Sequence, residues 1–182
     1  LKKIPNYKQK YDFVLITSSK SINIFLRYLN LYSKIHSKLP KIFVIGQQTG
    51  NELRRKNFTS FYQASGSSKD VIELTLSETS NYQKGIWLCG FHRNKNLKKI
   101  FLTNKRFVKH KVVYEMRPNE IISESNLIKF QNSKKNSFIV NSSRNILLLN
   151  QILNKYDILD KLTLNSKIFC MSDLIKKDAF SL

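Results

Sequence analysis

The stretch Asp12–Leu26 reads DFVLITSSKSINIFL, and a second stretch of the same design, NSFIVNSSRNILLLN, occupies Asn136–Asn150. In each, a largely β-branched apolar run stops at a Ser-Ser pair, a basic residue follows, and an apolar pattern with helical spacing begins. The matching loops are offset by 124 residues. Each copy therefore predicts a strand, a polar loop and a helix.

A second pair of similar segments has nearly the same offset. KIFVIG at Lys41–Gly46 matches KIFCMS at Lys167–Ser172, 126 residues later. Two pairs at nearly one offset indicate a duplicated unit, so we expect two similar lobes. Ligands usually bind in clefts, and a cleft between the two lobes is the expected place.

Strand-like and helical patterns alternate along the whole chain. Amphipathic stretches such as Ile22, Phe25, Leu26 and Leu29 separate the strand-like runs. This alternation predicts the α/β class, with doubly wound parallel sheets and right-handed crossovers. The expected strands cover residues 12–17, 41–46, 59–63, 85–89, 109–114, 136–141 and 166–171.

Pro118 is the best candidate for a boundary between the lobes. It lies between the two copies of the repeat, and the residue before a proline disfavours helix. We therefore expect a first lobe over residues 1–117, and a linker return with a partial second lobe over residues 118–182. The second lobe is expected to be incomplete because only Asp173–Leu182 follows the last strand-like run.

The composition predicts a globular cytoplasmic protein with no membrane association. Hydrophobic residues make up 41%, and no apolar stretch approaches the roughly 20 residues of a membrane span. No secretory leader opens the sequence. Cys89 and Cys170 have no neighbouring metal-ligand pattern, which favours reduced, buried thiols.

The formal net charge of +20 leaves three interpretations open. Of the 32 cations 25 are lysines, a bias that AT-rich codon usage also produces, so a merely solvated surface is one interpretation. The second is a polyanionic small molecule as partner. Binding to nucleic acid is the third and the least favoured, because the lysines are dispersed.

Polar loops follow several of the expected strands. Thr17-Ser18 and Ser142-Ser143 lie where ligands bind to open parallel sheets, at the carboxyl ends of strands. Their hydroxyl groups and the helix N-termini suit carboxylates or phosphates. Helix capping alone and capping with ligand contact both remain open.

Two further turns and one tyrosine complete the candidates from the residues. Gly46 to Thr49 form a strand-to-helix turn expected to face the same cleft, and Gly66 to Ser68 precede another helix, where capping is favoured. Tyr114 lies at the end of a strand-like run. It could donate a proton there, or it could be an aromatic side chain that covers the edge of the sheet. GxGxxG, GxxxxGK[ST], GxSxG and HExxH patterns are absent, and the three histidines lack metal-ligand spacing.

Taken in order, the motifs resemble the uroporphyrinogen-III synthase family over nearly the whole chain. They are Ile16-Thr17-Ser18, Val44 to Thr49, Gly66-Ser67-Ser68, Leu88-Cys89-Gly90, Leu97 to Leu102, Val112-Val113-Tyr114 and Val140-Asn141-Ser142. The resemblance implies two α/β lobes joined by a two-stranded linker. It also implies a monomeric, cofactor-free lyase of haem biosynthesis, which cyclises hydroxymethylbilane to uroporphyrinogen III with D-ring inversion and loss of water.

The same resemblance assigns the site residues. Tyr114 is the expected catalytic residue. The expected substrate-binding residues are Thr17, Ser18, Gly46, Thr49, Ser67, Gly90, Ser142 and Ser143.

The sequence departs from the family pattern at several positions. In the second Gly-x-x-Thr turn Ser172 replaces the glycine, Ile175 replaces the threonine, and Asp173 adds an acid. Asn94 replaces the arginine of the helix after Gly90, with Arg93 adjacent. The family's opening strand and helix, and its last ones, have no counterpart in this sequence. The alternatives are an inactive synthase-like protein that binds tetrapyrroles or anions, and a basic RNA-binding protein.

Overall fold

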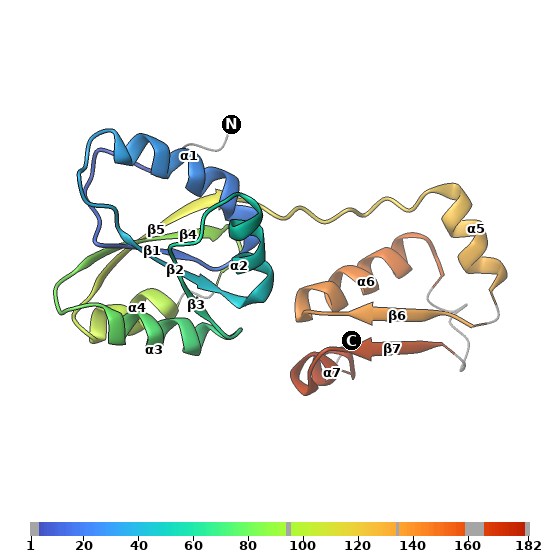
Figure 1. Ribbon diagram of the computed structural model, residues 1–182. Helices are drawn as coiled ribbons and strands as arrows, with labels where there is room; N and C mark the ends of the chain where they lie inside the picture. Colours follow the sequence, from blue (N-terminus) through green and yellow to red (C-terminus); the bar gives the residue numbers. More distant parts are fainter. Residues whose placement is uncertain (1–3, 94–95, 134, 159–165, 181–182) are drawn as a thin grey trace. The chain divides into compact units, whose positions relative to one another are not determined.

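The computed structural model describes residues 4–93, 96–133, 135–158 and 166–180. The chain divides into two units, Leu1–Met116 and Arg117–Leu182, each described by itself (Figure 1). The boundary expected from Pro118 lies one residue from this division. Asn94, where the family pattern has an arginine, lies outside the described residues.

Unit 1 is a parallel sheet with helices on both faces (Figure 1). The strand order is β3-β2-β1-β4-β5, and every neighbouring pair is parallel. The predicted doubly wound α/β lobe is therefore confirmed. The elements of unit 1 are β1 (Phe13–Ile16), η1 (Ser19–Ser21), α1 (Ile22–Ser33), β2 (Lys41–Ile45), α2 (Gly46–Arg55), β3 (Tyr62–Ala64), α3 (Ser68–Glu78), β4 (Lys84–Gly90), α4 (Asn96–Thr103) and β5 (Phe107–Tyr114).

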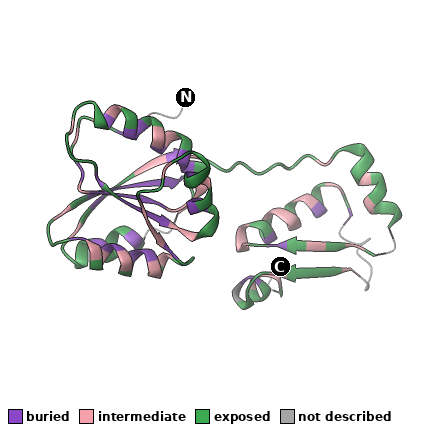
Figure 2. Ribbon diagram, in the orientation of Figure 1, coloured by how far each residue is buried: buried purple, intermediate pink, exposed green. Residues whose placement is uncertain are grey.

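The β1 strand is buried on both sides, which explains its uninterrupted apolar run. Val14 and Ile16 face one core, which helix α1 covers with Phe25 and Tyr28. The alternate residues, which include Phe13, belong to the opposite core, where α3 and α4 pack. Figure 2 shows this burial as purple along the central strands.

The sheet changes winding direction between β1 and β4. The chain leaves β1 toward β2 and β3, and then crosses back so that β4 and β5 extend the sheet on the other side of β1. Two neighbouring crossovers that diverge in this way open a crevice at the carboxyl ends of the strands, where such sheets bind ligands. Thr17 follows β1 and Gly90 ends β4, so both residues lie at this crevice.

Unit 2 repeats the first part of unit 1. The strands of unit 2 pair in parallel from Ser137↔Lys167 to Val140↔Cys170, as β1 and β2 pair from Phe13↔Lys41. These positions correspond at the offsets 124 and 126, so the duplication extends to the register of the sheet. The elements of unit 2 are α5 (Glu124–Asn132), β6 (Ser137–Val140), α6 (Ser143–Lys155), β7 (Lys167–Cys170) and α7 (Asp173–Phe180).

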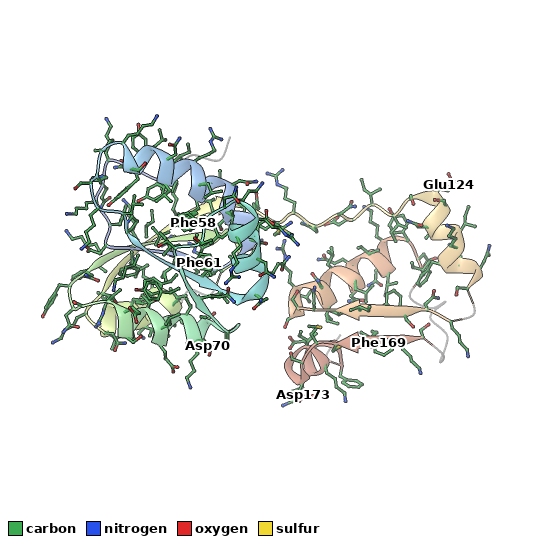
Figure 3. All side chains as sticks on the ribbon, viewed as in Figure 1. Phe58, Phe61, Asp70, Glu124, Phe169 and Asp173 are labelled. Carbon is green, nitrogen blue, oxygen red and sulfur yellow. The ribbon has the colours of Figure 1, made fainter. Side chains whose placement is uncertain are left out.

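Unit 2 has fewer strands than unit 1 in the described residues. Ile139 on β6 is 80% exposed and Phe169 on β7 (labelled in Figure 3) is 54% exposed, whereas their counterparts Leu15 and Phe43 are fully buried. The difference arises because α3 and α4 cover this face in unit 1. The described residues of unit 2 leave the corresponding face open.

Two features differ from expectation. Strand β3 begins at Tyr62 and not at Thr59, because Phe58 and Phe61 (labelled in Figure 3) stack on each other at 6.5 Å, and Arg54 lies over the Phe61 ring. Helix α5 was not predicted. The chain passes between the units once, through residues 115–123, and no strand is assigned there. A two-stranded linker requires a second pass between the units, and this part of the expectation stays a prediction.

None of the helices in the described residues combines the length and the hydropathy that a membrane span requires.

Candidate active site

A cavity of about 270 Å³ lies at the carboxyl edge of the unit 1 sheet. The ends of all five strands or the loops that follow them contribute to it, as expected for a binding crevice at the change of winding direction. The residues that line it are Thr17, Ile45, Gly66, Ser68, Trp87, Gly90, His92, Arg93, Leu97 and Tyr114.

Trp87 fixes the hydroxyl group of Thr17. The indole Nε1–H donates to Thr17 Oγ1 at 3.0 Å, and the Trp87 side chain is otherwise buried in the core beneath the cavity. Because an indole N–H only donates, Thr17 Oγ1 is the acceptor in this bond. The hydroxyl proton of Thr17 is therefore directed to a different acceptor, and an anionic ligand in the cavity is a suitable one.

Gly90 and Tyr114 form a close pair across β4 and β5. They are opposite each other in register, next to a bulge, and Phe91 N–H donates to the Tyr114 carbonyl at 3.0 Å. A Cβ at position 90 would lie 2.8 Å from two carbons of the Tyr114 ring and 2.9 Å from its hydroxyl oxygen. Glycine is therefore needed at position 90 for Tyr114 to hold its place in the cavity wall.

Arg93 is the arginine of the cavity wall. Its Nη1 donates to the Phe91 carbonyl at 2.9 Å, and its Nη2 lies 2.9 Å from Nε2 of His110. The guanidinium is thus held from two sides, by the loop after β4 and by strand β5. A guanidinium in a cavity wall is a strong receptor for carboxylates.

The described residues that line the cavity include one guanidinium and no carboxylate, which favours an anionic ligand. The nearby thiol of Cys89 is fully buried, and burial raises its pKa to about 11, which makes it a poor nucleophile. Among the described residues, no group of three or more His, Cys, Asp or Glu side chains could hold a metal ion.

Asp70, near the start of α3 (Figure 3), organises the loop that brings Gly66 and Ser68 to the cavity. Its Oδ2 accepts hydrogen bonds from Ser65 Oγ at 2.5 Å, Gly66 N at 3.2 Å and Ser67 N at 3.0 Å. These bonds, with the Ser65 hydroxyl first, lower the pKa of Asp70 from 3.8 to about 2. The carboxylate therefore stays ionised as the anchor of this loop.

We expect the Asp70 anchor to make stability depend on acid pH. The pKa of Asp70 is lower in the folded chain than in the unfolded chain. The contribution of its carboxylate to the free energy of unfolding is therefore fully present above about pH 4 and is lost as the pH falls through about 2. Urea unfolding at pH 7, 4, 3 and 2 should show Asp70→Asn less stable than wild type at pH 7, with the difference narrowing toward pH 2. Glu73→Gln, on the same helix, is the control, and an equal narrowing there would contradict the prediction.

A second, amide-rich cavity of about 580 Å³ lies between η1 with the start of α1 on one side and helix α2 on the other. The turn at Gly46, with φ of 77°, directs Gln47 and Gln48 into this cavity. Thr49, expected to face the cleft, is 4% exposed and lines neither cavity, because the first turn of α2 points it at the sheet. The residues that line this second cavity are Ser19, Lys20, Asn23, Gln47, Gln48, Asn51, Glu52 and Arg55.

Three of the other predicted binding residues, Ser18, Ser67 and Ser142, are helix caps. Ser18 Oγ accepts from Lys20 N–H and Ser142 Oγ accepts from Asn145 N–H, each at 3.3 Å, with nearly identical backbone angles. Ser67 forms a capping box with Asp70, as expected. Ser142 caps α6 in unit 2 and Ser143 is the first residue of that helix. Of the nine predicted site residues, the cavity in unit 1 brings together Thr17, Gly90 and Tyr114.

Comparison with known families decides the relationship. The family model described as uroporphyrinogen-III synthase HemD matches residues 1–181. The chain belongs to the uroporphyrinogen-III synthase family. A comparison with curated proteins gives no significant match.

Solved uroporphyrinogen-III synthases share the fold. The wild-type enzyme from the extreme thermophile Thermus thermophilus is 13% identical with a TM-score of 0.51, over 96% of this chain and 69% of that one. The enzyme from Helicobacter pylori 26695 is 14% identical with a TM-score of 0.55, over 91% of this chain and 70% of that one. At these identities the likeness concerns the fold.

The departures from the uroporphyrinogen-III synthase pattern at the second turn have a structural explanation. Ile175 is 7% exposed and packs with Val140 and Ile146, so it occupies a core position, as Thr49 does in unit 1. Ser172 Oγ accepts from Ile175 N–H at 3.4 Å and caps α7, whereas Gly46 begins α2 with a positive φ. The replacements exchange one helix start for another and remove no hydroxyl from the unit 1 cavity.

We expect Ile175→Thr, which restores the family residue, to lower the stability of unit 2 without increasing catalysis. Replacing the buried ethyl branch of isoleucine by a hydroxyl should cost about 2–3 kcal/mol. Urea unfolding monitors the first effect, and the rate of product formation monitors the second. Ile128→Thr, at a position 49% exposed on α5, is the matched control. A gain in rate with Ile175→Thr would contradict this interpretation.

Sequence reasoning missed Trp87 as part of the site and noted Arg93 only as a neighbour of Asn94. A signal for Trp87 was present, because a tryptophan in a buried strand needs an acceptor for its N–H. The role of His110 had no sequence signal, since its partner Arg93 is 17 residues away in the chain.

Proposed function

We propose that this chain is a uroporphyrinogen-III synthase, a lyase that cyclises hydroxymethylbilane to uroporphyrinogen III with inversion of the last pyrrole ring and release of water. One observation carries the proposal. Thr17, Gly90 and Tyr114, which the family resemblance assigns to the site, line a single cavity although they lie at the ends of three different strands or directly after them.

The donors of the cavity suit the acidic side chains of the substrate. Thr17 offers a hydroxyl proton that Trp87 orients, and Arg93 offers a guanidinium. No described residue of the lining is a carboxylate that would repel the substrate. In unit 2 the loop at Ser142 and Ser143 repeats the construction of the loop after β1, and we propose that its hydroxyls also bind substrate carboxylates.

Tyr114 is the proposed proton donor. Its hydroxyl protonates the leaving hydroxyl of the bilane, the C–O bond breaks, and water departs to leave a cationic pyrrole methylene. The α-carbon of the last ring that already carries the bridging methylene attacks this cation and becomes a spiro centre. Its old bond to the bridging methylene then breaks, which leaves a second methylene cation on the neighbouring ring. The free α-carbon of the last ring attacks that cation and loses a proton, which balances the proton given by Tyr114, so the ring is inverted and the macrocycle is closed. Most of the catalytic demand is positioning of a flexible chain, which fixed donors at a rigid sheet edge supply.

The test is to incubate the protein with enzymatically generated hydroxymethylbilane, oxidise the products and separate the uroporphyrin isomers. We expect isomer III in excess over the spontaneous isomer I, which a sample without protein measures. Isomer I alone would contradict the proposed activity.

A binding assay separates the alternatives. Trp87 is the only tryptophan of the chain and lies in the cavity wall, so quenching of its fluorescence by uroporphyrin reports occupancy of the site. Quenching without isomer III would indicate an inactive tetrapyrrole-binding protein. An RNA-binding protein would instead bind RNA with an affinity that falls steeply as salt is raised.

A further inference from the structure

The contact between Arg93 and His110 joins the loop after β4 to the edge strand β5. Nη2 of Arg93 and Nε2 of His110 are 2.9 Å apart, and the second terminal nitrogen of Arg93 donates to the Phe91 carbonyl. His110 is exposed and does not line the cavity, whereas Arg93 does. His110 is therefore placed behind a residue of the cavity wall.

The chemistry of the two side chains determines the direction of the bond. A guanidinium has no acceptor, so His110 Nε2 must accept, and the imidazole is neutral with its proton on Nδ1. The surroundings favour this form. Partial burial, the charge of Arg93 and the charge of Lys98 on α4 all lower the pKa of His110, and its cross-strand partner on β4 is the uncharged Trp87.

The bond leaves Arg93 suited to an anion. Two of its five N–H donors are used for the bonds to Phe91 and His110, and the guanidinium plane is thereby fixed at the cavity wall. A fixed guanidinium loses less side-chain entropy when it binds a carboxylate than a mobile one does. The described lining offers no carboxylate to compete for it.

We propose that His110 is a positioning residue, which orients Arg93 so that its guanidinium receives a carboxylate of the substrate. This inference rests on the proposed function, and it adds to that function the residue that binds the carboxylate and the residue that acts through it. A bond that only stabilised the loop after β4 would have different consequences for substrate binding.

The experiment is a double-mutant cycle on KM and kcat with hydroxymethylbilane, using Arg93→Gln, His110→Leu and the double variant. We expect Arg93→Gln and His110→Leu each to raise KM by about tenfold, with kcat changed less than about twofold. His110→Leu should add nothing in the Arg93→Gln background, because His110 acts only through Arg93. His110→Gln, whose Oε1 can accept in place of Nε2, should restore KM to within about twofold of wild type.

The control is Lys109→Gln, which removes a charge from the neighbouring exposed position on β5 and should leave KM unchanged. The inference is overturned if the effects of Arg93→Gln and His110→Leu are additive, if His110→Gln behaves like His110→Leu, or if only kcat falls. The same double-mutant cycle can be measured on the affinity for uroporphyrin, from the quenching of Trp87 fluorescence, and this measurement does not require catalysis. If isomer III forms but the effects of the two substitutions are additive, only the role proposed for His110 is refuted. If the protein neither forms isomer III nor shows quenching, the proposed function is refuted as well.

Discussion

Replacing Tyr114 by phenylalanine should lower kcat by about 100-fold and change KM less than about twofold. The variant removes the hydroxyl that we propose as the proton donor to the leaving group, and positioned acids contribute rate factors of about this size. The ring that packs over Gly90 is retained, so the cavity wall and the stability of unit 1 should be preserved. Steady-state kinetics of isomer III formation give both constants.

The matched control is Tyr82→Phe. Tyr82 is exposed, lies in the turn before β4 and does not line the cavity. Its variant should keep wild-type kinetics. If Tyr114→Phe also kept the wild-type kcat, Tyr114 would be only an aromatic side chain that covers the sheet edge, and the proton would have to come from another group or from water.

Replacing Gly90 by alanine should reduce kcat by roughly 10- to 100-fold, although no hydroxyl is removed. A Cβ at position 90 would lie within 2.9 Å of the Tyr114 ring carbons and hydroxyl oxygen, so the ring must move. A displacement of about 1 Å in a catalytic group is sufficient for such a loss. The same overpacking should lower the free energy of unfolding by about 1–3 kcal/mol.

Two controls separate displacement of Tyr114 from general damage. Gly66→Ala adds a methyl group to the same cavity lining, where no atom lies within 4 Å, and should have little effect. In the Tyr114→Phe background, Gly90→Ala should still cost stability, because the ring is still displaced, but should lower kcat little further. A loss with Gly66→Ala as large as with Gly90→Ala would contradict the role of the close pair.

The duplication places a similar loop after the first strand of each repeated segment. Loops of one construction, with caps at Ser18 and Ser142, follow the first strand of each copy. In unit 1 the loop borders a cavity because β4 and β5 complete the sheet beside β1. The described part of unit 2 has only the β6-β7 pair. The site chemistry therefore depends on strands outside the repeated segment as well as on the repeat.

The amino-acid sequence by itself determined the local plan of this protein. An apolar run, a polar loop with Ser18 or Ser142, and an apolar pattern with helical spacing specify a strand, a capped loop and a helix. The sequence can specify them because each pattern depends on residues only a few positions apart. The seven strands of the described residues and the parallel α/β class followed from these signals, whereas the register of the repeat came from the structure.

Only the tertiary structure decided which side chains meet at the site. Thr49 and Thr17 both looked like ligands from their loops, yet the rotation of α2 buries Thr49, and the winding of the sheet brings Thr17 to the cavity. The bond from Trp87 to Thr17 spans 70 residues of sequence. Such contacts depend on strand order and register, which no local pattern encodes, and these determine the donors that the substrate would meet.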